Sequence, residues 1–315
     1  MSYRLVVPSR ERAAWLNAQA TFNTSRRLSA AGIPFELYVR EDDLQLSAYG
    51  LMANKLGATL VLQDPSALGA AQTYDSLIDQ CARDNVERLV VLDDDLWFKA
   101  FDSRSREVWP KLVYADPEEL KHGLDMFAAM TCEEAPAASL CSIMKRNTPG
   151  ARSEGDGLVK YCVPLMWAYS FYIPHFAAHP EHRFWQGKHI EARCDLNLSL
   201  MLLTQGWLTT RLRFLFIPEN VNNPGGCSTY RSIELERQSV KYLQERYPGA
   251  VKTHKMRGWV GDPNIERDAP SVQYNAAFNR PEFARLHGRT AGEFAAEHLL
   301  AAEARCEAFY AGRRA

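Results

Sequence analysis

The chain has 315 residues, 46% of them hydrophobic, and a formal net charge of −1. This length and apolar content suffice for a large buried core in one domain, with or without an appendage. The near-zero charge excludes a polycation that coats nucleic acid along its whole length, but it does not exclude a local basic patch.

The seven cysteines are scattered, with no C-x-x-C pair. This pattern favours reduced thiols in a cytosolic setting over a disulfide framework or a cysteine zinc site. The opening MSYRLVVPSRERA has too short an apolar run for a signal peptide, and no stretch approaches the roughly 18 apolar residues of a membrane span. We therefore expect a soluble, cytoplasmic protein with no membrane partner.

Strand and helix patterns alternate with short connections over about the first 95 residues. This alternation predicts an α/β fold, with a Rossmann-like, mostly parallel sheet and helices on both faces. The predicted strands are residues 3–9, 34–42, 58–64 and 88–92, and the predicted helices are residues 11–32, 46–57 and 70–85.

The pattern is less regular after residue 98, and no internal repeat is present. We expect one domain over residues 1–230, with halves of about 1–100 and 101–230, and a helical extension over 231–315 that packs on it. Later predictions are helices at 116–135, 195–206, 232–248 and 291–312, strands at 139–144, 161–173 and 207–218, and a polar loop at 145–157.

The stretch RLVVLDDDLWF places three adjacent aspartates at the end of the fourth predicted strand. Ligands of open α/β sheets bind beyond the carboxyl ends of the strands. In extended backbone Asp93 and Asp95 point to one side and Asp94 to the other, so we expect Asp94 to contact the nucleoside of a bound nucleotide, or protein, instead of a metal ion. Two carboxylates on one side suit Mg²⁺ or Mn²⁺, with coordination positions left for a diphosphate. A solvated turn, or a helix cap by Asp95, is the alternative that this position in the sheet disfavours.

The exits of the first two strands carry further polar residues. Pro8, Ser9, Arg10 and Arg12 lie at a strand-to-helix junction, where amides and guanidinium groups can bind phosphate or a base. Glu41 follows the second strand and could accept a hydrogen bond from a base or ribose. The alternatives are a helix cap with surface arginines and a solvated acidic turn. No G-x-G-x-x-G or P-loop sequence is present, which weighs against dinucleotide or P-loop binding.

Glu191 and Asp195 stand four residues apart, and Asp195 opens a strongly apolar helix. A carboxylate at a helix start is stabilised by the helix dipole and can act as a general base toward an acceptor hydroxyl. The alternative is that Asp195 only caps the helix.

Weaker signals come from aromatic, glycine-rich and basic segments. Aromatic residues in this half could stack on a sugar or base, or form plain core: they are Trp167, Tyr169, Phe171, Tyr172 and Trp207. Gly225 and Gly226 could expose backbone amides to a ligand, or make an ordinary turn. His254, among Lys252, Lys255 and Arg257, could be a third metal ligand, or part of a solvent-exposed basic loop.

The chain resembles GT-A glycosyltransferases over about residues 3–230. The resemblance rests on the first strand ending in VPS, on VLDDDLWF at the fourth strand and on the later EARCDLNLSLMLLTQGW. The resemblance implies a GT-A-like catalytic domain in which Asp93 and Asp95 bind Mn²⁺ or Mg²⁺ on the diphosphate of a nucleotide sugar, most simply a UDP-sugar. Asp195 becomes the candidate base. The acidic pair is usually adjacent in such enzymes, whereas ARC separates Glu191 from Asp195 here, so the base could be either residue. In the helix before the three aspartates, this chain has QTYDSL where many GT-A enzymes have Arg-Asn, so different contacts are expected there.

The order of these segments, together with ELYVREDDLQLSAYGL and NNPGGCS, is more specifically similar to the TET-associated glycosyltransferases of bacteriophages. That resemblance implies DNA carrying 5-hydroxymethylcytosine or a related hydroxymethylpyrimidine as acceptor, in the cytoplasm of the host cell. The reacting base would leave the stack, and Trp97, Trp167 or Trp185 could hold it. The basic residues available for DNA phosphates are Arg104, Arg106, Lys145, Arg146, Arg152, Arg183, Lys188, Arg193, Arg211 and Arg213.

Three alternatives stay open at the level of sequence. One is the same fold acting on a saccharide or protein acceptor, and another is a non-catalytic nucleotide-binding protein. The third is a nucleotidyltransferase, which usually needs a glycine-rich loop after strand 1 that VPSRERA lacks.

Overall fold

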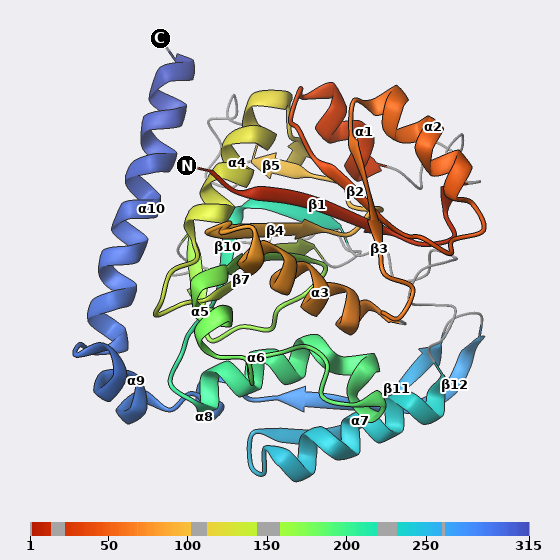
Figure 1. Ribbon diagram of the computed structural model, residues 1–315. Coiled ribbons are helices and arrows are strands. Elements are labelled where there is room, and N and C mark those ends of the chain that lie inside the picture. The colour runs from red at the N-terminus through yellow and green to blue at the C-terminus, as the bar shows by residue number, and fades with distance from the viewer. Residues whose placement is uncertain are drawn as a thin grey trace.

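The computed structural model describes residues 2–13, 23–67, 69–101, 112–143, 158–218, 232–259 and 262–314. Its centre is a 10-stranded sheet in the order β3-β2-β1-β4-β9-β7-β10-β5-β6, with β8 also paired to β10 (Figure 1). The strands are β1 (Arg4–Ser9), β2 (Glu36–Arg40), β3 (Thr59–Gln63), β4 (Arg88–Leu92), β5 (Lys99–Phe101), β6 (Leu112–Tyr114), β7 (Ala137–Ile143), β8 (Val159–Tyr161), β9 (Ala168–Tyr172) and β10 (Thr209–Pro218).

Most strands of this sheet run in one direction. β1 pairs in parallel with β2 and β4, and β2 pairs in parallel with β3. β9 is antiparallel to both β4 and β7, so β7 regains the direction of β4, and β10 is parallel to β7. The short strands β5 and β8 run against β10. The predicted fold class, an α/β protein with a mostly parallel sheet, is confirmed.

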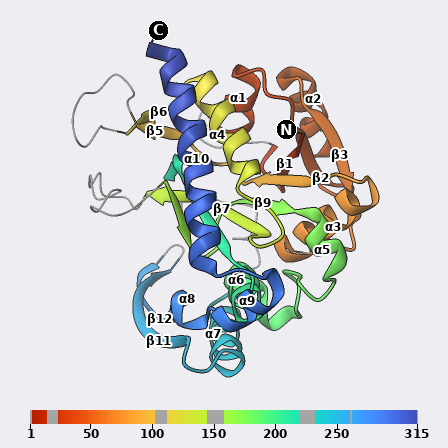
Figure 2. The ribbon, with the colours of Figure 1, turned by 90° about the vertical axis from the view of Figure 1, so that its left-hand side faces the viewer.

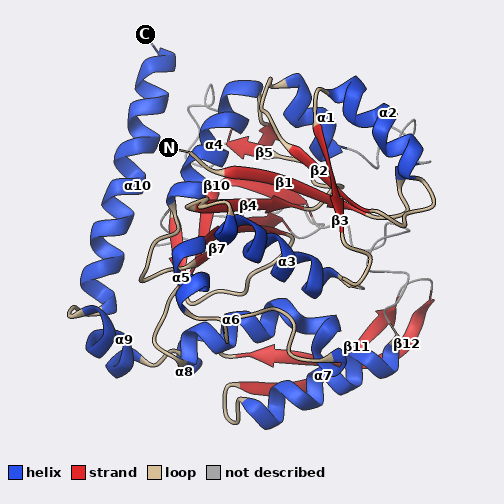
Figure 3. Cartoon of the chain, viewed as in Figure 1, coloured by secondary structure: helices blue, strands red, loops and turns tan. Residues whose placement is uncertain are grey.

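Each face of the sheet has its own apolar core, because successive strand residues point to opposite faces. Leu5 and Val7 of β1 join one core cluster, and Val6 joins the other. Figure 3 shows α1, α2 and α4 on one side of the strands and α3 and α6 on the other. The first face is covered by α1 (Asn23–Ala30), α2 (Leu46–Leu56), α4 (Pro117–Ala129) and α10 (Ala291–Arg314), and the second by α3 (Ala70–Arg83), α5 (Ile173–Ala178) and α6 (Cys194–Thr204).

The C-terminal region differs from the predicted helical extension, because it contains a β-hairpin. After α7 (Ile233–Arg246) the chain forms β11 (Val251–Trp259) and β12 (Asp262–Val272), which pair antiparallel. Residues 252–257 are all exposed, so the segment has no apolar alternation to identify it as a strand. The helices α8 (Tyr274–Ala277) and α9 (Arg280–His287) then lead to α10.

The long helix α10 lies beside α4 (Figure 2). Near its end the Arg313 guanidinium contacts the Asp116 carboxylate, and Asp116 also caps α4 by accepting the Glu119 amide at 2.9 Å. This ion pair holds the C-terminal helix on the same body as the sheet. Within the described ranges, no helix is both long and apolar enough to cross a bilayer.

Candidate active site at the carboxyl end of the sheet

The order of the central strands places the exits of β1 and β4 side by side. From β1 the chain builds β2 and β3 on one side of the sheet, and it then returns to add β4 on the other. The carboxyl ends of β1 and β4 therefore flank the point where the strand order reverses, which is where open α/β sheets bind ligands. Ser9 ends β1, and Asp93 follows β4 directly.

The three aspartates lie in a tight turn. β4 ends at Leu92, and the Asp93 amide donates to the Trp167 carbonyl at 3.1 Å. The Thr24 hydroxyl bridges the turn, donating to the Asp93 carbonyl at 2.6 Å and accepting from the Leu96 amide at 2.8 Å. The prediction that extended backbone sends Asp94 to the side opposite Asp95 is therefore wrong, because the strand has already ended and both carboxylates contact the Arg12 guanidinium.

Asp94 joins the two strand exits. Its carboxylate is buried, accepts the Ser9 hydroxyl at 2.5 Å and pairs with the Arg12 guanidinium. The same guanidinium lies 3.3 Å from the Asp95 carboxylate. The structure thus brings together Ser9, Arg12, Asp94 and Asp95. The sequence predicted that Asp94 contacts either the nucleoside or protein; it contacts protein groups here, and a contact with the nucleoside stays a prediction.

Asp93 lies on the α3 side of this group and accepts a hydrogen bond from the Tyr74 hydroxyl at 3.3 Å. Burial, and then the charges of Asp95 and Asp94, raise the pKa of Asp93 well above its usual range. Burial also raises the pKa of Asp94, although Arg12 opposes the shift. Burial alone would lower the pKa of Arg12, but the charges of Asp94 and Asp95 outweigh it and raise that pKa.

Among the described residues, this site groups three carboxylates around one buried guanidinium. Three carboxylates surround the Arg12 guanidinium, whereas Arg10 pairs with Glu11 at 3.3 Å. A divalent cation held by Asp93 and Asp95 would offset the repulsion between these neighbouring carboxylates, and oxygen ligands of this kind suit Mg²⁺ or Mn²⁺. The donor set at Asp93 and Asp95 therefore fits the ion that the sequence predicted.

Stability in the absence of metal tests this charge balance. Because the pKa of Asp93 is raised, its contribution to stability is fully present below the usual carboxyl range and is lost as the pH rises through the raised pKa. With EDTA present, Asp93→Asn is expected to raise the free energy of unfolding at pH 8 by about 1–3 kcal/mol, and to change it little at pH 4.

Urea unfolding of both proteins at the two pH values measures this difference. Glu307→Gln, which alters an exposed carboxylate on α10, is the control. Equal stability of wild type and Asp93→Asn at pH 8 in EDTA would contradict an unbalanced buried charge.

Asp43 and Tyr49 bind the backbone that follows β1, whereas Glu41 makes no such contact among the described residues. Glu41 is exposed, and its amide donates to the Gln63 carbonyl. Asp43 instead accepts the Glu11 amide at 2.9 Å, where Glu11 has a φ of 55°. The buried Tyr49 hydroxyl accepts the Arg12 amide at 3.0 Å and lies 2.8 Å from the Ser9 hydroxyl. The sequence showed Asp43 only as one of a run of acids, and Tyr49 only as helical core.

Glu191 lies at the N-terminus of α3. A Cβ at Gly69, the residue that precedes α3, would lie 1.5 Å from Glu191 Oε1, so only glycine leaves room for this carboxylate. The N-terminal end of a helix dipole stabilises a carboxylate there. Tyr74, which donates to Asp93, is little more than one turn further along α3. α3 thus links the position of Glu191 to the aspartate turn.

Asp195 lies in the first turn of α6 and is not its cap. The residue before the helix is Arg193, and Asp195 Oδ1 accepts the Leu196 amide at 2.8 Å. The pKa of Tyr274 is raised, first by burial and then by the charge of Asp195. Asp195 is thus not at the cap position itself, although it accepts a first-turn amide as a capping residue does, and its role as general base stays a prediction.

The aromatic segment is mostly core. Tyr169 and Phe171 are buried in β9, and Trp207 is buried as well. Trp167 differs, because it is half-buried, has a φ of 55° and accepts the Asp93 amide through its carbonyl. Of the predicted stacking residues that are described, Trp167 is the one joined directly to the aspartate turn.

Several predicted DNA-contacting arginines are engaged within the protein. Arg213 is buried, and Arg211 donates to the Pro164 carbonyl at 3.2 Å. Arg183 pairs with Asp79, and Arg193 pairs with the buried Glu236. The prediction that these side chains contact DNA phosphates is therefore not supported, because their charges are used internally. The side chains of Arg104, Arg106, Lys145, Arg146, Arg152 and Lys188 lie outside the described part.

His254 is an exposed residue of β11. Among the described side chains, the sets of three or more potential ligand atoms within 4.8 Å of one another contain neither His254 nor the three aspartates. A cation at Asp93 and Asp95 would thus take its other ligands from the donor, from water or from residues not described. Gly225 and Gly226 lie within residues 219–231, outside the described residues.

No protein-family model and no curated protein matches this sequence. In structure the chain is similar to a mannosyltransferase from Pyrobaculum calidifontis, solved with GDP-Man and Mn²⁺, at 13% identity and a TM-score of 0.49. That similarity covers 98% of this chain and 76% of the other.

Two further similar structures are S. aureus TarS 1-349 with UDP and GalNAc-T7 with UDP, GalNAc and Mn²⁺. The first has 9% identity and a TM-score of 0.42, covering 78% of this chain and 66% of that one. The second has 9% identity and a TM-score of 0.44, covering 79% and 48%. All three TM-scores are below 0.5, so the function is inferred below from the residues of the site.

Proposed function

We propose that the protein is a metal-dependent glycosyltransferase that uses a nucleoside-diphosphate sugar, most simply a UDP-sugar, as donor. The observation that carries this proposal is the buried turn of Asp93, Asp94 and Asp95 against Ser9 and Arg12, at the point where the strand order reverses. Adjacent carboxylates beside a guanidinium suit a divalent cation with a bound diphosphate.

Each residue then has a distinct task. Asp93 and Asp95 would hold Mn²⁺ or Mg²⁺, which supplies charge neutralisation of the departing nucleoside diphosphate. Asp94 holds Arg12 and Ser9 in place, so Arg12 can face the diphosphate without swinging away. Trp167 is half-buried and its backbone carbonyl accepts the Asp93 amide, so we assign its side chain to contact with the nucleoside or acceptor.

Sugar transfer also needs a base for the acceptor. The acceptor oxygen forms a bond to the anomeric carbon while the bond from that carbon to the diphosphate oxygen breaks. The hydroxyl proton moves to a carboxylate, and we assign that role to Asp195, which opens α6. Glu191 lies against the start of α3, which suits a positioning role better than proton transfer.

For the acceptor we propose a hydroxymethylated pyrimidine in DNA, supported by the order of sequence segments described above. The competing acceptor is a saccharide or protein. It is favoured by the internal pairing of Arg183 and Arg193 and by the burial of Arg213, which reduce the charge available for phosphates.

Mass spectrometry of nucleosides distinguishes these acceptors. The protein is incubated with Mn²⁺, a panel of nucleotide sugars, and either hydroxymethylated or plain DNA. A sugar-sized mass increment on the hydroxymethyl nucleoside alone is expected. If sugar is transferred to saccharides while the DNA stays unmodified, DNA is not the acceptor, but the protein is still a glycosyltransferase. A protein that binds UDP without Mn²⁺ and transfers no sugar would fit a non-catalytic binding protein.

A further inference from the structure

A group of histidines lies at the opposite end of β4 from the aspartate turn. β9 runs antiparallel to β4, so Tyr172 pairs with Arg88 at the start of β4, and α5 follows at once. The sequence HFAAHPEH, residues 175–182, supplies His175, His179 and His182, which we call the histidine cluster. The proposed glycosyltransferase site makes no use of these residues.

Local structure brings the three rings together. His175 and His179 stand four residues apart at the end of α5, a spacing that places them on one face. Pro180 cannot continue the helix, and the His182 amide donates back to the His179 carbonyl at 3.0 Å. The ring centroids lie 4.6 Å apart for His175 and His179, and 5.1 Å apart for His175 and His182. Trp207 packs edge-on against all three rings.

With the Gln205 amide in the orientation that the structure has, the hydrogen bonds of the buried rings assign a proton to one nitrogen of each ring. Gln205 presents its carbonyl Oε1 to His182 Nε2 at 2.8 Å, so this nitrogen is the donor. His182 Nδ1 then accepts, and His175 Nε2, 2.9 Å away, donates to it. A neutral His175 is left with a lone pair on Nδ1. Both rings are fully buried, and burial away from solvent disfavours a charged imidazole.

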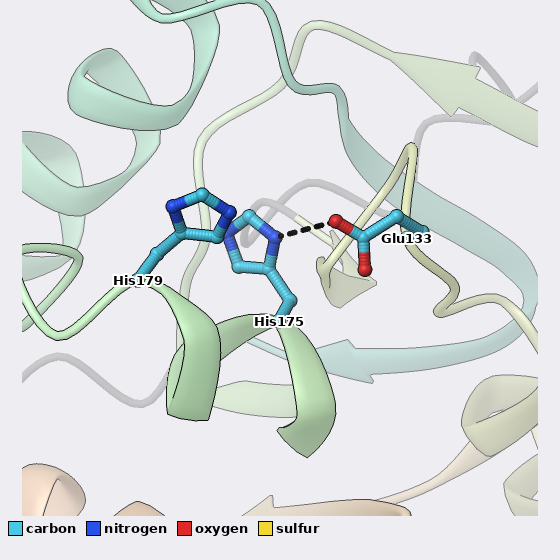
Figure 4. Close-up of side chains that lie close together, drawn as sticks. All are labelled: Glu133, His175 and His179. Atoms are coloured by element: carbon cyan, nitrogen blue, oxygen red, sulfur yellow. Dashed lines mark hydrogen bonds and ion pairs between the residues drawn. The ribbon is translucent and has the colours of Figure 1, made fainter. Parts of the chain in front are cut away.

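That lone pair faces a carboxylate. His175 Nδ1 lies 3.5 Å from Glu133 Oε1, in the connection between α4 and β7, and two acceptors so placed repel each other unless a proton or a metal cation lies between them. Figure 4 shows His179 beside this pair, with one ring nitrogen turned toward His175 and the other turned away. His179 Nδ1 lies 3.3 Å from Glu181 Oε1, which leaves Nε2 for another partner.

We propose that Glu133, His175 and His179 bind a Zn²⁺ ion through Glu133 Oε1, His175 Nδ1 and His179 Nε2. One ligand atom from each of these residues lies within 4.8 Å of the others, and the 3.5 Å between Nδ1 and Oε1 is close to the ~3.3 Å that tetrahedral zinc requires. Two imidazoles and one carboxylate suit zinc better than Mg²⁺ or Mn²⁺.

The surroundings match those of ligated histidines, which donate their second nitrogen to an acceptor. His175 donates to His182 and His182 to Gln205, while His179 faces Glu181. The ion would join α5 to the connection between α4 and β7, and the half-exposed Glu133 side chain gives it a path from solvent. We therefore assign the site to stabilising the fold at the end of the central strands β4 and β9 that lies opposite the aspartate turn.

Zinc titration of the full chain tests this site. The Asp95→Ala variant serves as the parent, so that zinc at the aspartate turn does not contribute. After chelation and dialysis, we expect one equivalent of Zn²⁺ by calorimetry, a higher Tm with Zn²⁺, and visible absorption bands of tetrahedral Co²⁺ on substitution. Glu133→Gln and His179→Gln should each remove these signals. Both side chains are partly exposed, so neither substitution should prevent folding.

His254→Gln, on the exposed hairpin, is the matched control and should keep zinc binding. Retention of binding by Glu133→Gln together with loss in Glu181→Gln would overturn the ligand assignment, because Glu181 with His179 and His182 is the neighbouring set. Absence of zinc binding by the parent would overturn the site itself. The contacts from Gln205 through His182 and His175 to Glu133 would then be ordinary hydrogen bonds. In that case the Gln205 amide is reversed and its nitrogen donates to His182, so that His175 Nδ1 carries the proton toward Glu133.

Discussion

Replacing Asp95 with alanine is expected to reduce sugar transfer by about 10³-fold or more, since the ion on the leaving diphosphate contributes several kcal/mol to the transition state. Asp95 is almost buried, and its carboxylate lies 3.3 Å from the Arg12 guanidinium. Its loss leaves Asp93 as a single carboxylate for the ion and removes one partner of Arg12. The rate of transfer from a UDP-sugar at saturating Mn²⁺ measures the effect.

Glu307→Ala, an exposed carboxylate on α10, is the control for nonspecific loss. Circular dichroism of the Asp95→Ala protein should match that of wild type, because removing one of three neighbouring carboxylates relieves repulsion. Full activity of Asp95→Ala, or of wild type in EDTA, would remove the metal from the mechanism.

Replacing Asp195 with asparagine is expected to lower kcat by about 10²–10⁴-fold while donor binding is kept, the range typical of a general base. Asparagine preserves the shape of the side chain and its acceptor oxygen toward the Leu196 amide, so α6 should start as before. Turnover at saturating acceptor, together with UDP affinity in Mn²⁺, separates the loss of a base from the loss of the donor site.

Glu191→Gln is the matched comparison, because the side chain that lies against Gly69 keeps its size. If Asp195 is the base, Glu191→Gln should lower the rate far less than Asp195→Asn does. A larger loss in Glu191→Gln would transfer the role of base to Glu191. Unchanged turnover in both variants would show that the base lies elsewhere.

The alternating first half of the chain made the fold predictable. Continuous apolar runs such as RLVVL, each followed by a helical pattern, are typical of buried parallel strands. The hairpin of β11 and β12 was missed because residues 252–257 are exposed and carry no alternation of apolar and polar side chains. Strand β9 was expected only as part of an aromatic region, and its antiparallel direction depends on long-range pairing with β4 and β7.

The candidate site was predictable in its parts but not in its contacts. Strand-end position identified Ser9, Arg12 and the aspartates. The rule of alternating side chains failed at Asp94, because the Thr24 bridge turns the chain there. Asp43 and Tyr49 support the β1 exit through amides that are 32 and 37 residues away, which no local pattern reveals.

The proposed zinc site at the histidine cluster was not predicted from the sequence, because the cysteines alone were considered as zinc ligands. Scattered cysteines argued against a cysteine zinc site, but His175 lies in α5 and His179 follows its last residue, four positions later, a spacing that also occurs between metal ligands. Its partner Glu133 is 42 residues from His175 and meets it only in the folded chain. His254, chosen for its basic neighbours, instead lies exposed on the hairpin.

The central claim is that Asp93 and Asp95 hold a divalent cation that binds a nucleoside diphosphate. Calorimetric titration of wild type and Asp95→Ala with UDP, in Mn²⁺ and in EDTA, tests it most directly. We predict that wild type binds UDP in Mn²⁺ and loses at least about tenfold in affinity in EDTA, and that Asp95→Ala shows the weak affinity in both conditions. Equal UDP affinity of wild type with and without Mn²⁺ would contradict the claim.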